Sequence, residues 1–373
     1  MIVLITLRIP LSLDYVLTES RRNPADDPLV LWQQGGPGSS GFGYGWLAEL
    51  GPYVLDADSL SSNTTATPRP FEREFSWDAT SNLLLFEHPP GTGFSYCVDS
   101  ADKPVPCTWN DQTQAQAFYQ SLLAFYDKYP TFKQKDLHMI GESYAGLLLP
   151  FLTAEILRHP AEVPAKQLRG LAVGNGCPGT SGATPAKRGS CNGPYGSYDT
   201  QHVLELAAGH SAIPRDLWAS LRKACGFPCA APTWSEQCDG PFSVECEALI
   251  SKADAAVGPF NIYNFYDNCG GGNQLNAGAG DNPQVATILS HAARFRDGQD
   301  APPSSGGQEY PCGTGRAATI WANTPEVREA LHMRPQSFYG RPWSLQAGAG
   351  MEYTTYTGAS FDLYPEILQH VDV

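Results

Sequence analysis

Between Pro28 and Gly176, short apolar runs alternate with segments of helical periodicity, and this alternation limits the possible folds more than any other feature of the sequence. Four of the runs are typical of buried strands, because each is short, apolar and bounded by turn residues: 28–32, 83–87, 137–140 and 168–173. Two helical segments, 111–129 and 144–158, separate the later runs. Strands joined through helices of this length form a mainly parallel sheet covered on both faces. The predicted fold class is therefore α/β.

The sequence changes in character after Gly176. Eight of the ten cysteines lie beyond this point, among clusters of Gly, Pro and Ser, and no further parallel-strand pattern appears there. Three segments have helical periodicity: 199–209, 214–224 and 243–256. We therefore expect a helical insertion held together by disulfides. Near the end of the chain, Thr324-Pro325 predicts the start of a short helix through Leu331.

The charge balance argues against two classes of partner. The chain has 24 basic and 38 acidic side chains, a net charge of −14, and a charge of this sign repels nucleic acid and anionic membranes. No uncharged apolar run approaches the roughly 20 residues that a membrane span requires. We therefore expect neither a nucleic-acid nor a membrane partner, whereas the oligomeric state is not indicated.

The cysteines indicate an oxidising compartment of the cell rather than a metal site. Their number is even, ten, and none is spaced with His or Cys neighbours as a zinc site requires, so we expect disulfides and neither a metal nor another cofactor. One glycosylation sequon begins at Asn63. Disulfides and glycosylation both indicate the secretory pathway.

The segment Gly141-Glu142-Ser143-Tyr144-Ala145-Gly146 follows a predicted strand and begins a predicted helix. A sharp turn in this setting lifts a serine hydroxyl out of the carboxyl edge of a sheet, where it can act as a nucleophile. Ala145 replaces the second glycine of the G-x-S-x-G pattern but is small enough for such a turn. The alternative is that Ser143 is an ordinary helix N-cap.

A second motif, WQQGGPGSS at 32–40, comes directly after the first predicted strand. Its glycines allow backbone N–H groups to point into a cavity without obstruction by side chains. A hydrolase with a nucleophilic serine needs such a second N–H donor, aimed at the oxyanion of the tetrahedral intermediate. The alternative is a structural Gly-Pro turn.

These motifs and several others, in the same order, resemble those of the serine carboxypeptidases, α/β-hydrolase exopeptidases that work at acid pH. The shared segments are 28–40, ELGPY at 49–53, 77–96, IGESYAG at 140–146, GLAVGNG at 170–176, 260–269 and 325–333. The resemblance implies an α/β-hydrolase fold, with a mainly parallel sheet flanked by helices and a disulfide-stapled helical cap. The core would comprise 1–176 and, incompletely, 311–373, and the cap would comprise 177–310.

The resemblance also implies the roles of the site residues. Ser143 would be the nucleophile, and the N–H groups of Gly36 and Tyr144 would form the oxyanion hole. Five residues would surround the terminal carboxylate of the substrate: Trp32, Gln34, Gly35, Glu49 and Glu142. Two acidic side chains can bind an anion only if protons are shared, so acid pH would favour binding. The alternative is that both glutamates are solvated surface residues.

The cysteine positions carry two further expectations. The resemblance implies a disulfide between Cys269 and Cys312, which flank the return from the cap to the core. We also expect four cysteines of the cap to pair among themselves: Cys225, Cys229, Cys238 and Cys246.

The chain departs from the pattern of the family in several places. Gln34 stands where the family usually has Asn, and Ser39 replaces a cysteine, so the disulfide that would join it to the region of Ser344 is expected to be absent. His88-Pro89-Pro90 replaces a Ser-Pro-Ala run, and we interpret His88 as a structural residue at a strand end.

The last departure concerns the triad. In this family the acid and the base follow the cap, but the chain stops at Val373, and none of its eight histidines stands in the expected Gly-His-Met-Pro type of setting. The sequence thus resembles a fragment. Without the following strands, the run from Leu168 to Val173 is expected to form an exposed apolar edge.

The predicted function is that of a secreted or vacuolar/lysosomal serine carboxypeptidase, which removes C-terminal residues from peptide or protein substrates through an acyl-enzyme on Ser143. Two alternatives remain open. One is an acyltransferase that uses the same nucleophile and oxyanion hole, and the other is a non-catalytic scaffold that retains only the fold.

Overall fold

The computed structural model describes residues 3–4, 7–8, 11–55, 59, 67–177, 200–227, 242–257, 313–354 and 360–373. Asn63, the proposed glycosylation site, and both Cys269 and Cys312 lie outside these ranges, as do Cys229 and Cys238.

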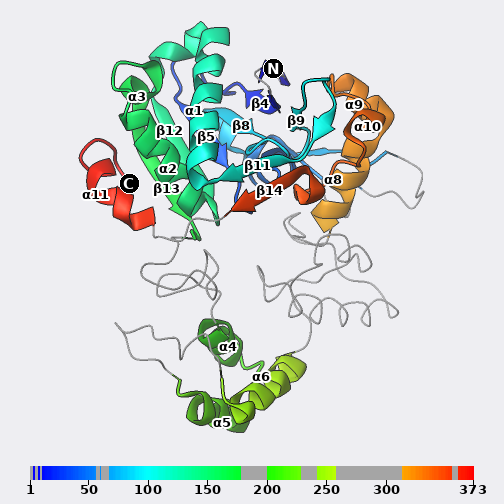
Figure 1. The fold of residues 1–373 in the computed structure, drawn as a ribbon, viewed down its shortest axis with the longest axis vertical. Helices are drawn as coiled ribbons and strands as arrows, with labels where there is room; N and C mark the ends of the chain where they lie inside the picture. Colours follow the sequence, from blue (N-terminus) through cyan, green and yellow to red (C-terminus); the bar gives the residue numbers. More distant parts are fainter. Residues whose placement is uncertain are drawn as a thin grey trace.

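A six-stranded sheet lies at the centre of the upper group of elements in Figure 1. Its strand order is β1 (Val3–Leu4), β4 (Tyr15–Thr18), β8 (Asn82–Phe86), β5 (Leu29–Gln33), β12 (Leu137–Glu142) and β13 (Leu168–Gly174). The last four strands run parallel, whereas β1 and β4 pair antiparallel at one side. The predicted mainly parallel sheet is therefore confirmed.

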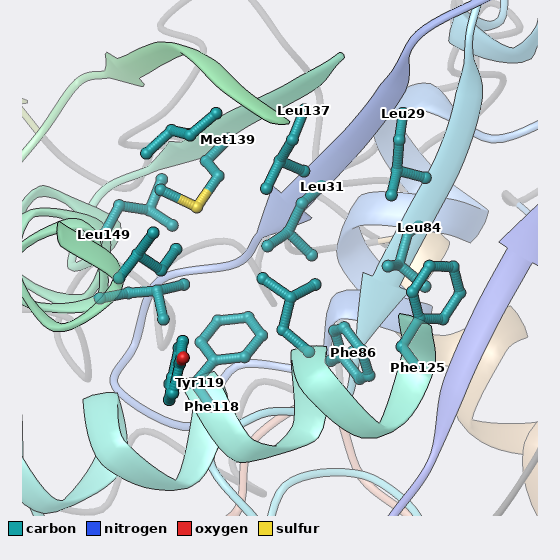
Figure 2. Close-up of a cluster of buried hydrophobic side chains, with 14 of the residues drawn as sticks. Leu29, Leu31, Leu84, Phe86, Phe118, Tyr119, Phe125, Leu137, Met139 and Leu149 are labelled. Atoms are coloured by element: carbon teal, nitrogen blue, oxygen red, sulfur yellow. The ribbon is translucent and has the colours of Figure 1, made fainter. Parts of the chain in front are cut away.

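The two inner strands β5 and β8 are mostly apolar and buried along their whole length because both faces of the sheet are covered there. On one face Leu29 and Leu31 contact a layer formed by α1 (Asp111–Lys128) and α2 (Ala145–Leu157), with Phe118, Phe125 and Leu149 in the interface (Figure 2). The alternate residues of the strands point to the other face. There they pack against two helices, η1 (Gly41–Leu50), which has π-type hydrogen bonding, and α8 (Gly313–Asn323). The strand residues on this face are Val30, Trp32, Leu83 and Leu85.

Local sequence sets the limits of α1. The Asn110 side chain accepts hydrogen bonds from the N–H groups of Gln112 and Thr113, which satisfies two of the free donors at the start of the helix. Pro130 follows the C-cap residue Tyr129. The helices predicted at 111–129 and 144–158 are thus confirmed to within one residue at each end.

Shorter strands surround the central sheet. A four-stranded sheet has the order β10 (Pro104–Val105), β9 (Tyr96–Val98), β3 (Leu11–Leu13) and β2 (Leu7–Arg8). Two pairs complete the set, β11 (Cys107–Asn110) with β14 (Met351–Thr354) and β6 (Tyr53–Val54) with β7 (Phe71–Glu72). A disulfide between Cys97 and Cys107 joins β9 to β11. Sequence periodicity did not predict these strands, because most of them have only two or three residues.

Three helices gather around a hydrophobic cluster of their own, set apart from the sheet (Figure 1): α4 (Thr200–Gly209), α5 (Arg215–Cys225) and α6 (Val244–Val257). They match the three helical segments predicted after Gly176. A disulfide joins Cys225 on α5 to Cys246 on α6, which confirms the part of the predicted cap pairing that lies within the described residues.

The prediction of an exposed apolar edge at β13 is wrong for residues 168–171, whereas Ala172 is exposed and Val173 half-buried. Leu168 and Leu171 are only 4% and 2% exposed. The Leu171 N–H donates to the Asp372 carbonyl at 2.8 Å, and the Asp372 N–H donates to the Arg169 carbonyl at 3.1 Å, so the end of the chain pairs with this edge. The physical reason is that α11 (Tyr364–Ile367) packs against α2 and directs the following residues to β13.

The remaining helices are short: α3 (Val163–Gln167), α9 (Pro325–Ala330), α10 (Gln336–Tyr339), η3 (Trp77–Ala79), η4 (Pro130–Gln134), η7 (Gly348–Gly350) and η8 (Ser360–Leu363). Helix α9 is the one predicted from Thr324-Pro325, and Thr324 is its N-cap. Within the described ranges, no helix has both the length and the apolar character needed to cross a membrane.

Candidate active site

Ser143 occupies a sharp turn between β12 and α2, at the carboxyl edge of the sheet. Its φ of 57° lies in the left-handed region, which is unfavourable for a residue with a side chain. Two neighbouring segments hold this conformation: the Ser143 N–H donates to the Gly174 carbonyl at 3.1 Å, and the Cys177 N–H donates to the Ser143 carbonyl at 2.8 Å. Because Tyr144 is the N-cap of α2 and no side chain caps that helix, the interpretation of Ser143 as an ordinary N-cap is wrong.

Two glycines make the turn possible. A Cβ on Gly141 would stand 2.5 Å from the Gln33 carbonyl oxygen and 2.7 Å from the Ala145 Cβ. A Cβ on Gly146 would stand 2.8 Å from the Cys177 backbone nitrogen and oxygen. The methyl group of Ala145 is therefore accommodated because Gly141 has no side chain.

The glycine-rich loop after β5 lies directly against the nucleophile. A Cβ on Gly35 would stand 2.7 Å from the Ser143 Cβ and 2.8 Å from the Tyr144 backbone nitrogen. Gly36 has a φ of 116°, and the Ser39 N–H closes the loop by donating to the Gly35 carbonyl at 3.1 Å. The two motifs that the sequence singled out therefore meet in space.

A hydrogen-bonded cluster of polar side chains lies beside this contact. The Trp32 Nε1 donates to the Gln34 Oε1 at 2.9 Å, and the Gln34 Nε2 donates to the Glu142 Oε1 at 2.6 Å. Glu49, from η1, lies beside this cluster, and both Gln34 and Glu142 act on its pKa. The longer amide side chain of Gln34 thus reaches the Glu142 carboxyl group, although it departs from the expected Asn.

Burial controls the protonation of this cluster. Desolvation, together with the nearby Glu142 carboxyl, raises the pKa of Glu49 to about 8. Burial also raises the pKa of Glu142 above its ordinary value. Two carboxyl groups in hydrogen-bond contact cannot both ionise, so the pair retains at least one proton at acid and neutral pH. The alternative that these glutamates are solvated surface residues is wrong, since both are partly buried and lie close enough for each to affect the pKa of the other.

His88 has the structural position that the sequence predicts. It follows β8, it is 1% exposed, and its ring stacks on Phe118 with 4.1 Å between ring centroids. The Nε2 atom lies 3.1 Å from the Gln114 Oε1, and burial lowers the pKa of His88 to about 3. The imidazole is therefore neutral and engaged in packing.

Hydrogen bonds join Ser39 to the segment near Ser344, the two places between which the family disulfide was expected to be absent. The Ser39 Oγ donates to the Gln346 Oε1 at 3.1 Å, and the two residues form an isolated backbone bridge. This contact ties the glycine-rich loop to the returning segment without a covalent link.

Sequence reasoning missed three residues around the nucleophile. The Cys177 sulfur, which is part of a disulfide, lies 3.9 Å from the Ser143 Oγ. Asp111 accepts hydrogen bonds from the hydroxyl groups of Tyr353 at 2.9 Å and Tyr144 at 3.2 Å. No local pattern distinguishes these residues, because they meet only through long-range packing.

The triad remains incomplete within the part of the chain that the structure describes. There, no histidine hydrogen-bonds the Ser143 Oγ. The described residues also contain no group of three or more His, Cys, Asp or Glu side chains that could hold a metal ion.

Comparison with known proteins identifies relatives of one kind. A model of the serine carboxypeptidase family matches residues 11–371. The chain is 32% identical to serine carboxypeptidase-like 33 of Arabidopsis thaliana, over 83% of this chain and 57% of that protein. It is 31% identical to the lysosomal protective protein of Mus musculus, over 87% of this chain and 61% of that protein. The chain thus spans about three fifths of the length of these two relatives.

One solved structure shows the same fold. It is a prohormone-processing carboxypeptidase from Saccharomyces cerevisiae, with a TM-score of 0.57 and 19% identity, and the match covers 99% of this chain and 70% of that one. The α/β-hydrolase fold expected from the sequence is therefore confirmed.

Proposed function

The chain belongs to the serine carboxypeptidase family, and we propose that the protein hydrolyses the last peptide bond of peptides and proteins through an acyl-enzyme on Ser143. One observation carries this proposal. The elbow that exposes Ser143 is in contact with Gly35, and the chain neighbours of these two residues, Glu142 and Gln34, are hydrogen-bonded to each other.

In the first step, the Ser143 Oγ attacks the carbonyl carbon of the scissile bond. The developing oxyanion accepts hydrogen bonds from the backbone N–H groups of Gly36 and Tyr144, which are fixed before the reaction begins. The C-terminal amino acid then leaves, and water hydrolyses the ester on Ser143. A base must take the proton from Oγ, and this is the one role that the described residues do not fill.

Recognition of the terminal carboxylate explains why the cleavage is limited to the chain end. Gln34 and Gly35 offer amide N–H groups, and a protonated Glu49 or Glu142 donates an O–H to the incoming anion. Trp32 holds the Gln34 amide in orientation through its 2.9 Å hydrogen bond. Because the donor must carry a proton, peptide affinity is greatest at acid pH.

The same family membership supports the compartment and the division of the chain. The disulfides and the lysosomal relative favour the secretory pathway or a lysosomal/vacuolar location. We propose a core formed by 1–176 and 311–373 and a cap formed by 177–310, since α4, α5 and α6 share a hydrophobic cluster separate from the sheet.

The test compares a peptide that has a free C-terminal carboxylate with its amidated twin. Mass spectrometry of the products should show stepwise loss of single residues from the free peptide and little from the amide, and Ser143→Ala should abolish both. Labelling of Ser143 by an organophosphonate reports the nucleophile independently. A chain that is neither labelled nor able to shorten the peptide would refute the proposal and favour the scaffold.

A further inference from the structure

Glu87 is a buried carboxyl group that the proposed chemistry does not use. It directly follows β8 and is 2% exposed. A buried carboxyl group is costly unless hydrogen bonds compensate its lost solvation, so its contacts indicate what it does.

The contacts of Glu87 converge on the start of η1. Its Oε1 accepts a hydrogen bond from the Ser40 Oγ at 2.6 Å. The backbone N–H groups of Gly41 and Phe42 act on the same carboxyl group and lower its pKa against the effect of burial. The first N–H groups of a helix have no partner within the helix. Glu87 thus places an acceptor beside these donors from the end of a neighbouring strand, and it is linked to them through the Ser40 hydroxyl.

The Ser40 hydroxyl extends this contact in two directions. It donates to Glu87 and accepts from the Gly43 N–H at 2.8 Å, which caps η1. Ser40 is also the residue that follows the closed loop of Gly35 to Ser39. The helix that begins here carries Glu49 in its last turn. One carboxyl group therefore joins the end of the glycine-rich loop to the start of the helix that holds Glu49.

A third segment closes over the same group. A Cβ on Gly93 would stand 2.3 Å from the Glu87 carboxyl carbon, and Gly93 has a φ of 53°, so only glycine suits this place. The charge of Arg341 acts on Glu87, and the Arg341 Nη2 donates to the Gly91 carbonyl at 2.8 Å. The carboxyl group is thus confined on several sides.

We propose that Glu87 is a positioning residue, whose acceptor oxygen holds the loop of Gly35 and Gly36 and the helix of Glu49 in one fixed relation. This inference rests on the proposed function for its consequence in catalysis, but the anchoring itself concerns only the backbone of residues 36–47.

Two substitutions separate anchoring from space filling. Glu87→Leu keeps a similar volume but removes the acceptor, whereas Glu87→Gln keeps one acceptor oxygen. We expect amide hydrogen exchange across 36–47 to become at least tenfold faster in Glu87→Leu and to stay near the parent rate in Glu87→Gln. Exchange in α1 should not change in either variant. Ser40→Ala, which keeps Glu87 in place, should give an intermediate increase, and it serves as the test if Glu87→Leu does not fold.

The consequence for the site is measured by the rate of Ser143 labelling with an organophosphonate. Glu87→Leu should slow labelling about tenfold, because displacement of oxyanion donors lowers reactivity, and Glu87→Gln should restore it. Glu72→Gln, at an exposed position on β7, is the surface control.

The outcomes distinguish the two proposals. Amide exchange at 36–47 that is as slow in both Glu87→Leu and Ser40→Ala as in the parent protein would overturn the anchoring. The same holds if exchange in Glu87→Gln is as fast as in Glu87→Leu. Failure of the parent chain to label Ser143 would count against the proposed function, while the exchange experiment would still decide the role of Glu87.

Discussion

Gly35 lies so close to Ser143 that a Cβ on the glycine would stand 2.7 Å from the Cβ of the serine. The contact joins the two glycine-containing motifs of the chain, and no side chain can be inserted between them. We therefore expect Gly35→Ala to displace the loop from the elbow, since backbone atoms of Glu142 and Tyr144 also stand within 3 Å of that Cβ.

The expected cost of Gly35→Ala is roughly 1 to 3 kcal/mol in the free energy of unfolding, with Ser143 labelling slowed about 100-fold. Urea denaturation and the labelling rate measure the two effects. Gly209→Ala is the matched control, because a Cβ there would meet nothing within 4 Å. Equal labelling of the two variants would contradict the proposed contact.

Peptide affinity should fall as pH rises. The raised pKa of Glu49, about 8, means that its proton is available below this pH and is lost above it. We expect the Kd of a peptide with a free C-terminus to rise between pH 6 and 9, and its amidated twin to show no such change. In Glu142→Gln the pH dependence should flatten, because the coupled pair no longer exists. An unchanged pH profile in that variant would exclude a shared proton.

Folding stability should also fall as pH rises from about 4.5 to 7. Burial raises the pKa of Glu87 from 4.5 to about 7, so the folded protein binds more protons than the unfolded chain within this window. The contribution of Glu87 to folding stability is therefore fully present below the pKa that Glu87 has in the unfolded chain, and it is lost as the pH rises through the pKa in the folded protein. At about 1.4 kcal/mol per pKa unit, the loss from Glu87 alone is roughly 3 kcal/mol.

Urea unfolding of the parent chain and of Glu87→Gln at pH 5 and pH 8 tests this dependence. The parent should lose stability between the two pH values, and the variant should lose about 3 kcal/mol less. Asp27 does not interfere, because its pKa is lowered to about 2 by the hydrogen bond from Arg22 and it titrates below this range. Identical slopes in the two proteins would show that Glu87 ionises normally.

The pairing of Cys269 with Cys312 stays a prediction. Peptide mapping without reduction should recover the two residues in one linked fragment, together with the linked pairs Cys97–Cys107 and Cys225–Cys246 as internal references. Closing a loop of about 40 residues should add roughly 3 to 4 kcal/mol to stability through the unfolded state. Detection of either cysteine as a free thiol would contradict the pairing.

Local sequence was sufficient for the long elements. Asn110 and Pro130 delimit α1 because a cap and a ring without an N–H act within a few residues of themselves. The strands β5 and β8 were predictable because their apolar runs are buried on both faces, and β12 and β13 were predictable because each is a short apolar run bounded by turn residues. The short strands were not predictable from local sequence. The pairing of β11 with β14, for example, joins residues more than 240 positions apart and involves only four residues in each strand.

The edge of β13 is a second feature that local sequence could not predict. Its residues are apolar, as the sequence predicted, but whether that edge is open depends on where the end of the chain lies. Asp372 reaches it because Ile367 and Val371 are buried in the same core as α2. No periodicity within 168–173 contains that information.

The sequence by itself indicated the turn at Ser143, because the residue types that suit a sharp turn lie within a few residues of the serine. The close approach of Gln33 to Gly141 and of Cys177 to Gly146, which leaves no room for a side chain, was decided by the tertiary structure. Only the tertiary structure decided the chemistry of Glu49, Glu142 and Glu87. The pKa of a carboxyl group depends on how much water is removed from it and on which charges lie within a few ångströms, and segments distant in the sequence set both conditions.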